Sequence, residues 1–511
     1  FGKCRQEGGD NMDIKRAKQE IKDAAAAYFM KNEFGEYEIP TIRQRPIFLL
    51  GAPGIGKTQI MEQVAKECAL GLVSYTITHH TRQSAIGLPY ISKNEYDGKE
   101  YEVTEYTMSE IVASVYEKMK QTGLKEGILF IDEINCVSET LAPAMLQFLQ
   151  CKSFGNHKIP EGWMIVAAGN PPEYNKSVRE FDVVTMDRVK KIEVEPDFSV
   201  WKEYAYKENV HAAVISYLRA KPSYFYQMEM TVDGMHFATP RGWEDLSRMI
   251  QMYEKLEKTV DREVVEQYVQ YPKIAKDFAN YLELYYKYRT DYQIDAVLSG
   301  SMDENLLKKI KHASFDERLS VVSLILAKLT GEFRNVYRLE AQTRVLFSCL
   351  KSYKNGLSYA EDGSTFLGTI LEETREEYEN KKKAELLNRE EGHAYRTTLE
   401  TLEMYWMKLK KESLTEKEAC FEYVRELFAA DKNVYTGAMD KAGQMLEYAF
   451  DFMEVLFGES QEMVAFMTEL NANFYSIQFL KEYECERYYQ YNKNLLFDEK
   501  EKTLLSRIER L

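Results

Sequence analysis

Residues 45–60 read RPIFLLGAPGIGKTQI, in which an apolar run is followed by a glycine-rich turn and the start of a helix. Five of these residues fill the phosphate-loop pattern G-x-x-x-x-G-K-[ST]: Gly51, Gly54, Gly56, Lys57 and Thr58. Glycines let the backbone fold tightly, so that successive N–H groups face an anion, and the following helix points the positive end of its dipole at the same charge. The stretch therefore predicts a nucleotide-binding site.

Two side chains of this loop carry distinct chemistry. Lys57 is placed to reach the β- and γ-phosphates of a nucleotide, and the Thr58 hydroxyl is placed to ligate Mg²⁺. The residues from the end of the strand into the first helical turn are the expected nucleotide contacts. They are Gly51, Ala52, Pro53, Gly54, Ile55, Gly56, Lys57, Thr58 and Gln59.

The composition describes an acidic chain with room for several domains. Its 511 residues include 67 Lys and Arg against 82 Asp and Glu, a net charge of −15, without the basic excess of a typical nucleic-acid binder. No apolar run approaches the ~18 residues that span a bilayer, and no secretory signal is present, so we expect no membrane association. The seven cysteines are scattered without a C-x-x-C pair, which predicts reduced thiols and a cytoplasmic protein.

Strands and helices alternate over residues 39–195. After the strand at Ile47–Leu50, four further apolar segments predict strands, and helical segments lie between them. This alternation predicts an α/β domain with a parallel sheet that is covered by helices on both faces. Tyr90–Tyr106 alternates apolar with polar residues around Asp97-Gly98, which indicates a hairpin. The further predicted strands are Leu72–Ile77, Ile128–Ile131, Trp163–Ala168 and Lys191–Val194.

The remaining regions are predicted to be helical. Residues 1–38 comprise a polar tail, Phe1–Asn11, which we leave out of the fold, and a helix over Asp13–Lys31. Residues 196–290 are expected to form a helical lid, in which Thr239-Pro240 starts a helix. Residues 291–511 contain no proline and are expected to be all helical. Within them we interpret the charged run Glu372–Glu391 as a solvated helix face.

Acidic and amide side chains follow two of the predicted strands. Asp132 and Glu133 come after Ile128–Ile131, and Asn170 comes after the next strand. Because the carboxyl ends of parallel strands meet at one sheet edge, these side chains should lie beside the phosphate loop. Asp132 is expected to hold Mg²⁺, Glu133 to deprotonate the attacking water, and Asn170 to sense the γ-phosphate or hold that water. The alternatives are a solvated acidic turn and a turn-forming Asn before Pro171-Pro172.

Two arginines complete the candidate site. Arg188 precedes the fifth strand, and is either a surface residue or a group that reaches a nucleotide bound by a neighbouring subunit. Arg241 stands at a predicted helix start, where its planar guanidinium is suited to bind an anion.

Taken together, these motifs resemble the AAA+ ATPases, specifically their MoxR-like branch, from about Ile39 to Tyr285. Three short sequence motifs are similar to those of that branch: Asp132-Glu133-Ile134-Asn135, Ala168-Gly169-Asn170-Pro171 and Thr239-Pro240-Arg241. The matched pieces are Gly51–Thr58 as Walker A, Ile128–Glu133 as Walker B, Asn170 as sensor 1, Arg188 as arginine finger and Arg241 as sensor 2.

One segment departs from the pattern of the family. Phe181–Val189 lacks the usual leucine-rich lead into the finger and ends in Arg188-Val189 rather than Arg-Phe. This departure leaves Arg179 as the fallback finger. Inserts similar to those of the branch occur at Tyr90–Tyr106 and Phe154–Pro160.

The resemblance implies a Mg²⁺-dependent ATP hydrolase that works as a hexameric ring. It implies that Glu133, Asn170 and Arg188 are catalytic, that Thr58 and Asp132 hold Mg²⁺, and that Arg241 contacts the nucleotide. Such rings remodel or mature a protein client in a chaperone-like manner, often with a partner that carries a von Willebrand factor A-like domain.

Two other functions remain open from the sequence. A nucleic-acid-directed AAA+ motor, such as a restriction-type translocase, would need basic channel residues, whereas the candidate loop Thr81–Ser84 offers one arginine. A small-molecule kinase shares the phosphate loop but needs neither Glu133 nor a finger. GTP is disfavoured because an N-K-x-D motif is absent, since Asn175–Val178 departs at its last position.

Overall fold

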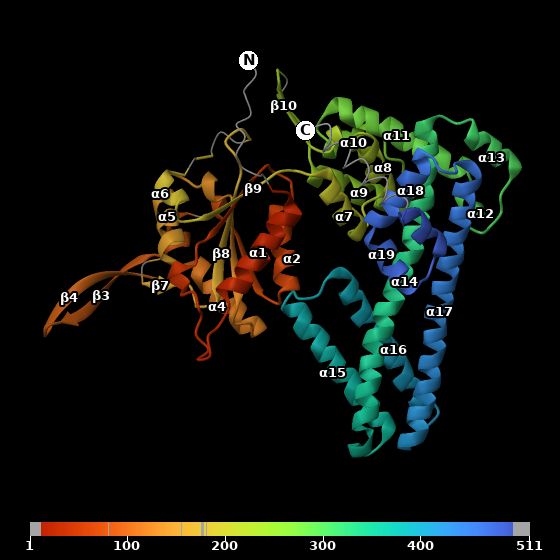
Figure 1. Ribbon diagram of the computed structural model, residues 1–511. Helices are drawn as coiled ribbons and strands as arrows, with labels where there is room; N and C mark the ends of the chain where they lie inside the picture. The colour runs from red at the N-terminus through yellow and green to blue at the C-terminus, as the bar shows by residue number, and fades with distance from the viewer. Residues whose placement is uncertain are drawn as a thin grey trace. The chain divides into compact units, whose positions relative to one another are not determined.

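A computed structural model describes residues 12–79, 81–154, 156–174, 178–179, 181–232 and 234–493. The predicted tail Phe1–Asn11 lies outside these residues. The chain divides into two compact units, which we call the sheet unit and the helical unit (Figure 1). The sheet unit runs up to Val200 and includes Thr239–Arg241 and Glu379–Asn388. The helical unit comprises the rest of the chain.

The sheet unit is built on five parallel strands in the order β2-β5-β8-β1-β9, which confirms the predicted parallel sheet. β1 lies between β8 and β9, with Ile47 opposite Val166 on one side and Lys190 on the other. All five strands end at the same edge, because every pair is parallel. The strands are β1 (Ile47–Gly51), β2 (Gly71–Thr76), β5 (Gly127–Asp132), β8 (Trp163–Gly169) and β9 (Lys190–Val194).

Both faces of this sheet are buried. On one face, Leu129 and Ile131 of β5 belong to a cluster that includes Phe148 of α5. The alternate residues, Ile128 and Phe130, are fully buried as well, on the side where α2 packs against β5 and α1. Continuous burial explains why β5 reads as an unbroken apolar run. The helices of the sheet unit are α1 (Ile14–Tyr28), α2 (Lys57–Glu67), α3 (Arg82–Ile86), α4 (Glu110–Thr122), α5 (Ala142–Cys151) and α6 (Val183–Met186).

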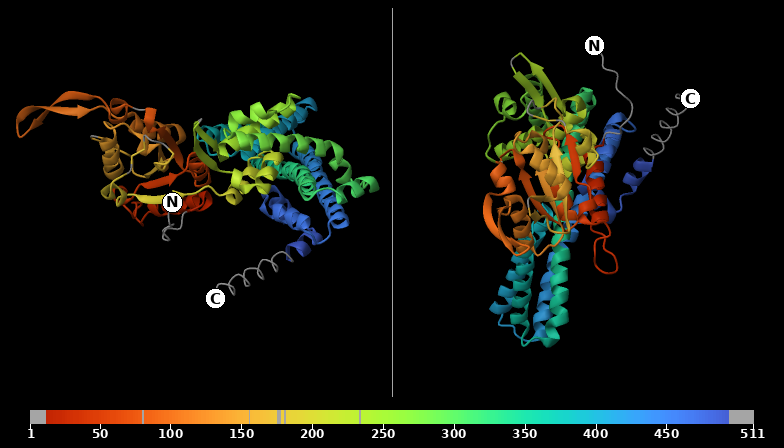
Figure 2. Two further views of the ribbon diagram at one scale, coloured as in Figure 1. Left: turned by 90° about the horizontal axis from the view of Figure 1, so that it is seen from above. Right: turned by 90° about the vertical axis from the view of Figure 1, so that its left-hand side faces the viewer.

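Two hairpins are inserted into the sheet unit. The predicted hairpin is confirmed as β3 (Pro89–Tyr96) and β4 (Lys99–Tyr106), which project away from the sheet (Figure 2). A shorter pair, β6 (Ser153–Phe154) and β7 (His157–Lys158), precedes β8. The interpretation of Thr81–Ser84 as a loop is wrong, because Thr81 caps the short helix α3 through a reciprocal bond with Ser84.

The helical unit contains two helices of unusual length, α14 and α17, against which most of the helices that follow α11 pack. α14 has 42 residues, which corresponds to about 63 Å. At one end α14–α17 share an apolar core that includes Leu350, Leu371, Leu402 and Val424. The helices are α7 (Phe198–Lys207), α8 (Ala212–Ala220), α9 (Pro240–Lys255), α10 (Arg262–Tyr268), α11 (Pro272–Asp291), α12 (Ile294–Val297), α13 (Glu304–Lys311), α14 (Phe315–Gly356), α15 (Gly363–Lys383), α16 (Arg389–Lys411), α17 (Lys417–Leu456), α18 (Gln461–Ala472) and α19 (Phe474–Glu482).

One part of the expected helical lid is not helical. β10 (Gln227–Thr231) and β11 (Gly234–Ala238) form an antiparallel pair that the sequence analysis did not predict. Methionine alternates with polar residues in β10, whereas β11 contains a single methionine, and Met230 of β10 is 66% exposed. Alternation with period two is typical of a half-buried strand, whereas methionine by itself favours helix.

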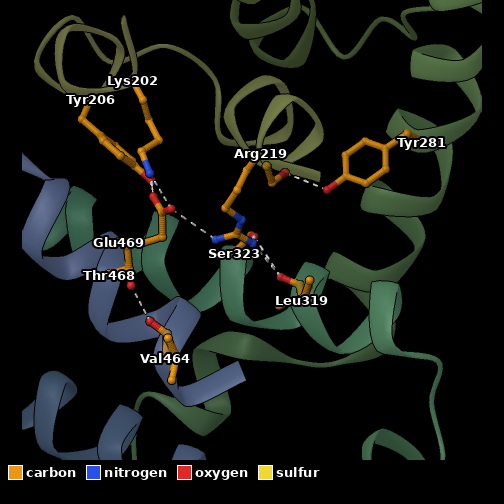
Figure 3. Close-up of polar contacts among 10 residues, drawn as sticks. Lys202, Tyr206, Arg219, Tyr281, Leu319, Ser323, Val464, Thr468 and Glu469 are labelled. Carbon is orange, nitrogen blue, oxygen red and sulfur yellow. Dashed lines mark hydrogen bonds and ion pairs between the residues drawn. The ribbon is translucent and has the colours of Figure 1, made fainter. Parts of the chain in front are cut away.

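Buried ionic contacts tie helices of the helical unit together (Figure 3). Glu469 of α18 accepts hydrogen bonds from Lys202 Nζ of α7 at 2.8 Å and from the Tyr206 hydroxyl. Its carboxylate also lies 3.7 Å from Arg219 Nη1 of α8, and Arg219 Nη2 donates to Ser323 Oγ of α14 at 2.8 Å. A single polar network therefore joins four helices that are distant in sequence.

Most charged residues of Glu372–Glu391 are exposed, as expected of a solvated face, but the largely buried Glu390 departs from that interpretation. Glu390 of α16 accepts hydrogen bonds from Arg334 Nη2 at 2.7 Å and from Arg338 Nε at 2.6 Å. Burial acts to raise the pKa of Glu390, but the hydrogen bonds from Arg338 and Arg334 outweigh it and hold that pKa at about 2. Glu390 is thus a packed ion-pair residue.

Within the described part of the chain, no helix is both long and apolar enough to cross a membrane.

Candidate active site

The phosphate loop joins β1 to α2 at the carboxyl edge of the sheet. β1 ends at Gly51 and α2 begins at Lys57, as the sequence motif predicts. Gly54 and Gly56 have φ of 76° and 95°, in the left-handed region that glycine adopts at little cost. Ala52 and Ile55 are buried, whereas Pro53, Thr58 and Gln59 are partly exposed. The backbone of the loop therefore has the shape that the motif requires.

The Lys57 side chain is buried and its ammonium is held by neutral acceptors. Nζ donates to the carbonyl oxygens of Gly51 at 2.7 Å and Ala52 at 2.9 Å, and to Asn170 Oδ1 at 2.9 Å. Among the described residues, no carboxylate forms an ion pair with this ammonium. Burial lowers the pKa of Lys57 to about 8; the Asp132 carboxylate opposes this shift, and the Arg241 charge adds to it.

Thr58 and Asp132 meet across the sheet edge. Thr58 Oγ1 donates to Asp132 Oδ2 at 2.9 Å, although 74 residues separate the two. Mg²⁺ in nucleotide sites is commonly held by one or two protein oxygens together with phosphates and water. This hydroxyl and carboxylate fit that donor set, and they stand beside Lys57, where phosphates would lie.

Glu133 is held in an uncommon backbone conformation. Its φ is 57°, and its N–H donates to Asp132 Oδ1 at 2.9 Å. A non-glycine residue in this region costs on the order of 1 kcal/mol, which the surrounding structure must compensate. The Glu133 carboxylate accepts a hydrogen bond from Thr78 Oγ1 at 2.9 Å. Thr78 follows β2 and was not predicted to belong to the site; its position at the same sheet edge is the one signal that could have indicated it.

Asn170 and Arg241 complete the group around Lys57. Asn170 follows β8, and its backbone is held by Asn135, whose own role the sequence analysis missed. Arg241, at the start of α9, donates its backbone N–H to Gly54 O at 3.3 Å and carries an exposed guanidinium. The structure thus brings together the predicted residues Lys57, Thr58, Asp132, Glu133, Asn170 and Arg241.

The two candidate finger arginines differ in their contacts. Arg188 is exposed just after α6, where its positive charge contributes, after the hydrogen bonds from Thr185, to a lowered pKa of Asp182. Arg179 Nη2 pairs with Glu139 at 2.6 Å within the same chain. The contacts described for both side chains lie outside the group around Lys57, so their predicted role in a neighbouring subunit stays a prediction.

Residues 46–189 match the family model of the AAA domain (dynein-related subfamily). None of the curated proteins matches the chain in sequence.

The structure is also similar to solved structures of RuvB from Thermotoga maritima. One mutant form and the Holliday junction branch migration motor each show 16% identity over 51% of this chain and 69% of theirs, with a TM-score of 0.28. A second mutant form shows 16% identity over 50% of this chain and 68% of its own, also with a TM-score of 0.28. With its phosphate loop and five-stranded parallel sheet, the segment 46–189 has the P-loop fold of an AAA domain.

Proposed function

We propose that this chain binds ATP with Mg²⁺ and hydrolyses the terminal phosphate. The observation that carries the proposal is the buried Lys57 ammonium, which lies at the phosphate loop without an anionic partner among the described residues. A nucleotide phosphate supplies the missing negative charge. Mg²⁺, when bound beside Thr58 and Asp132, neutralises charge on the phosphate oxygens.

In this proposal Glu133 is the base for the attacking water and Asn170 contacts the terminal phosphate. The Glu133 carboxylate extends from the same sheet edge as Asp132, one residue further along the chain. A positioned general base typically contributes on the order of 10²–10⁴ in rate. Thr78 donates a hydrogen bond to this carboxylate through its hydroxyl and so helps to position it.

We further propose that the active form is a hexameric ring in which Arg188 completes the site of the next subunit. Arg188 is exposed, and Val183 and Val184 of α6 beside it are 84% and 57% exposed. Exposed aliphatic residues next to an arginine suit a protein interface.

The ring is proposed to remodel a protein client in the chaperone-like manner of the MoxR-like branch, with a von Willebrand factor A-domain protein as its adaptor. Support comes from the D-E-I-N and T-P-R wording at Asp132 and Thr239 and from the acidic charge of the chain. The β3–β4 hairpin carries two lysines against five acidic residues, which disfavours a polyanionic track.

The decisive test is the Glu133→Gln variant, which keeps the shape of the side chain and removes its basicity. We expect this variant to bind ATP–Mg²⁺ as the wild type does, to lose at least about a hundredfold in turnover, and to accumulate as rings in ATP. Glu100→Gln on the β3–β4 hairpin serves as the control and should retain full activity. Wild-type turnover by Glu133→Gln would contradict the assignment, and strong stimulation of ATPase activity by DNA or RNA would favour the nucleic-acid motor.

A further inference from the structure

Asn135 is a buried amide that lies close to the site without contacting Lys57. It belongs to the short helix η3 (Ile134–Cys136), two residues after Glu133, and is 4% exposed. A buried amide must satisfy both its donor and its acceptor groups, so its partners indicate what it is placed to hold.

The Asn135 side chain contacts both backbone groups of one residue, Asn170, and its Oδ1 also accepts a long hydrogen bond from Cys136 Sγ at 3.9 Å. Nδ2 donates to Asn170 O at 2.7 Å, and Oδ1 accepts from Asn170 N at 3.3 Å. The backbone O of Asn135 also accepts from Arg179 N at 2.9 Å. Asn135 therefore fixes Asn170 at its N–H and its C=O simultaneously, as a neighbouring strand would.

We call the pair of hydrogen bonds from the Asn135 amide to the Asn170 backbone the clamp. Gly169, the residue before Asn170, leaves space for it. A Cβ atom placed on Gly169 would lie 2.5 Å from Asn135 Oδ1 and 2.7 Å from its Cγ, which is closer than such atoms approach. The amide of Asn135 and the missing side chain of Gly169 thus fit one another. The side chain of Asn170, which this clamp positions, accepts the Lys57 hydrogen bond at 2.9 Å.

We propose that Asn135 is a positioning residue for the terminal phosphate, because it fixes the backbone from which Asn170 reaches that phosphate. This inference rests on the proposed ATPase function and adds a residue to it. Aspartate cannot replace Asn135, since a carboxylate offers no donor to Asn170 O and would face that oxygen with a negative charge.

The test measures binding and turnover separately in Asn135→Asp and Gly169→Ala, which disturb the same clamp from its two sides. We expect ADP affinity to stay within about threefold of the wild type and kcat to fall by about 10- to 100-fold. The preference for a slowly hydrolysed ATP analogue over ADP should fall by about tenfold in both. Ser109→Ala, which removes the buried cap of α4 in the same unit, is the control for lost stability and should leave this preference unchanged.

A double-mutant cycle separates positioning from general destabilisation. If Asn135 acts through Asn170, Asn135→Asp should cost nothing further in the Asn170→Ala background. An additive loss, or an equal loss of ADP and ATP-analogue affinity in both clamp variants, would overturn the proposal and make Asn135 a structural residue. The preference in binding does not depend on hydrolysis, so an inactive wild type would refute the proposed function while this ratio still tests Asn135.

Discussion

Lys57 in the sheet unit is buried and Glu390 in the helical unit is largely buried, yet the pKa values of these two charged side chains are shifted for opposite reasons. The pKa of Lys57 falls to about 8, which means that its surroundings disfavour the charged form of a base. The pKa of Glu390 is held at about 2, which means that its surroundings favour the charged form of an acid. The two arginines beside Glu390 balance its charge within the chain, whereas the acceptors around Lys57 are neutral.

This difference separates a structural ion pair from a site that awaits a ligand. A buried charge without a partner is costly, and it persists where function needs it. Glu390 with its two arginines and Glu469 with its lysine and arginine join helices, and both carboxylates are paired within the chain. Lys57 leaves a positive charge that an incoming phosphate can neutralise.

The largest effect is expected for Lys57→Met, which removes the charge and keeps most of the side-chain volume. We expect it to abolish ATP–Mg²⁺ binding in a calorimetric titration, because no other buried cation is described at the phosphate loop. Without nucleotide, the Lys57→Met variant should be no less stable toward urea than the wild type, because burial of the Lys57 ammonium costs free energy. Unchanged ATP affinity would show that the Lys57 ammonium is not needed to bind the nucleotide.

Arg188→Ala extends the comparison to an exposed cation. The proposed anionic partner of Arg188 is the nucleotide phosphate bound by the neighbouring subunit. We expect normal ATP binding and a loss of about 10³–10⁵ in hydrolysis, or roughly 4–7 kcal/mol of barrier. Mixing it with Lys57→Met under subunit exchange should restore activity, because an intact pocket can then meet an intact finger. The same mixing with Arg179→Ala is the control. Absence of recovery at every ratio, with exchange demonstrated, would refute the assignment of Arg188, and recovery only with Arg179→Ala would move the finger there.

A smaller effect, on stability alone, is expected for Glu390→Gln. Removing this carboxylate leaves Arg334 and Arg338 without their shared partner, so the helical unit should lose on the order of 3 kcal/mol in urea unfolding. The exposed Glu400→Gln on the same helix should stay within about 0.5 kcal/mol. The contribution of Glu390 is present above its unfolded pKa of about 4.3 and disappears as pH falls toward about 2. A loss no larger than that of Glu400→Gln would show that the two arginines do not need Glu390.

The sequence predicted those parts of the site that rest on local pattern or on the rule for parallel strands. The phosphate loop is contiguous, and the meeting of Thr58 with Asp132 follows from the shared carboxyl edge. The role of Asn135 was not predicted, because its side chain binds backbone groups of Asn170, which carry no sequence signal. Thr78 was not predicted, because a single hydroxyl residue after a strand is common and does not by itself indicate a site.

In the helical unit, the limits of sequence reasoning have a different origin. Glu390 stands in a charged run that is typical of a solvated face, and its arginine partners lie more than 50 residues earlier in the chain. The hairpin β10–β11 competes with the helix propensity of its methionines, and tertiary packing decides the outcome.

The most direct test of the contrast between these charges is proton uptake on nucleotide binding, measured by calorimetry in two buffers of different ionisation enthalpy. Glu133→Gln is used to prevent turnover. A bound phosphate raises the pKa of Lys57 from about 8, so binding should take up about half a proton at pH 8 and nearly one at pH 9, and affinity should weaken as pH rises. Binding without proton uptake, with an affinity independent of pH between 8 and 9, would contradict the claim that the Lys57 ammonium pairs with the nucleotide phosphate.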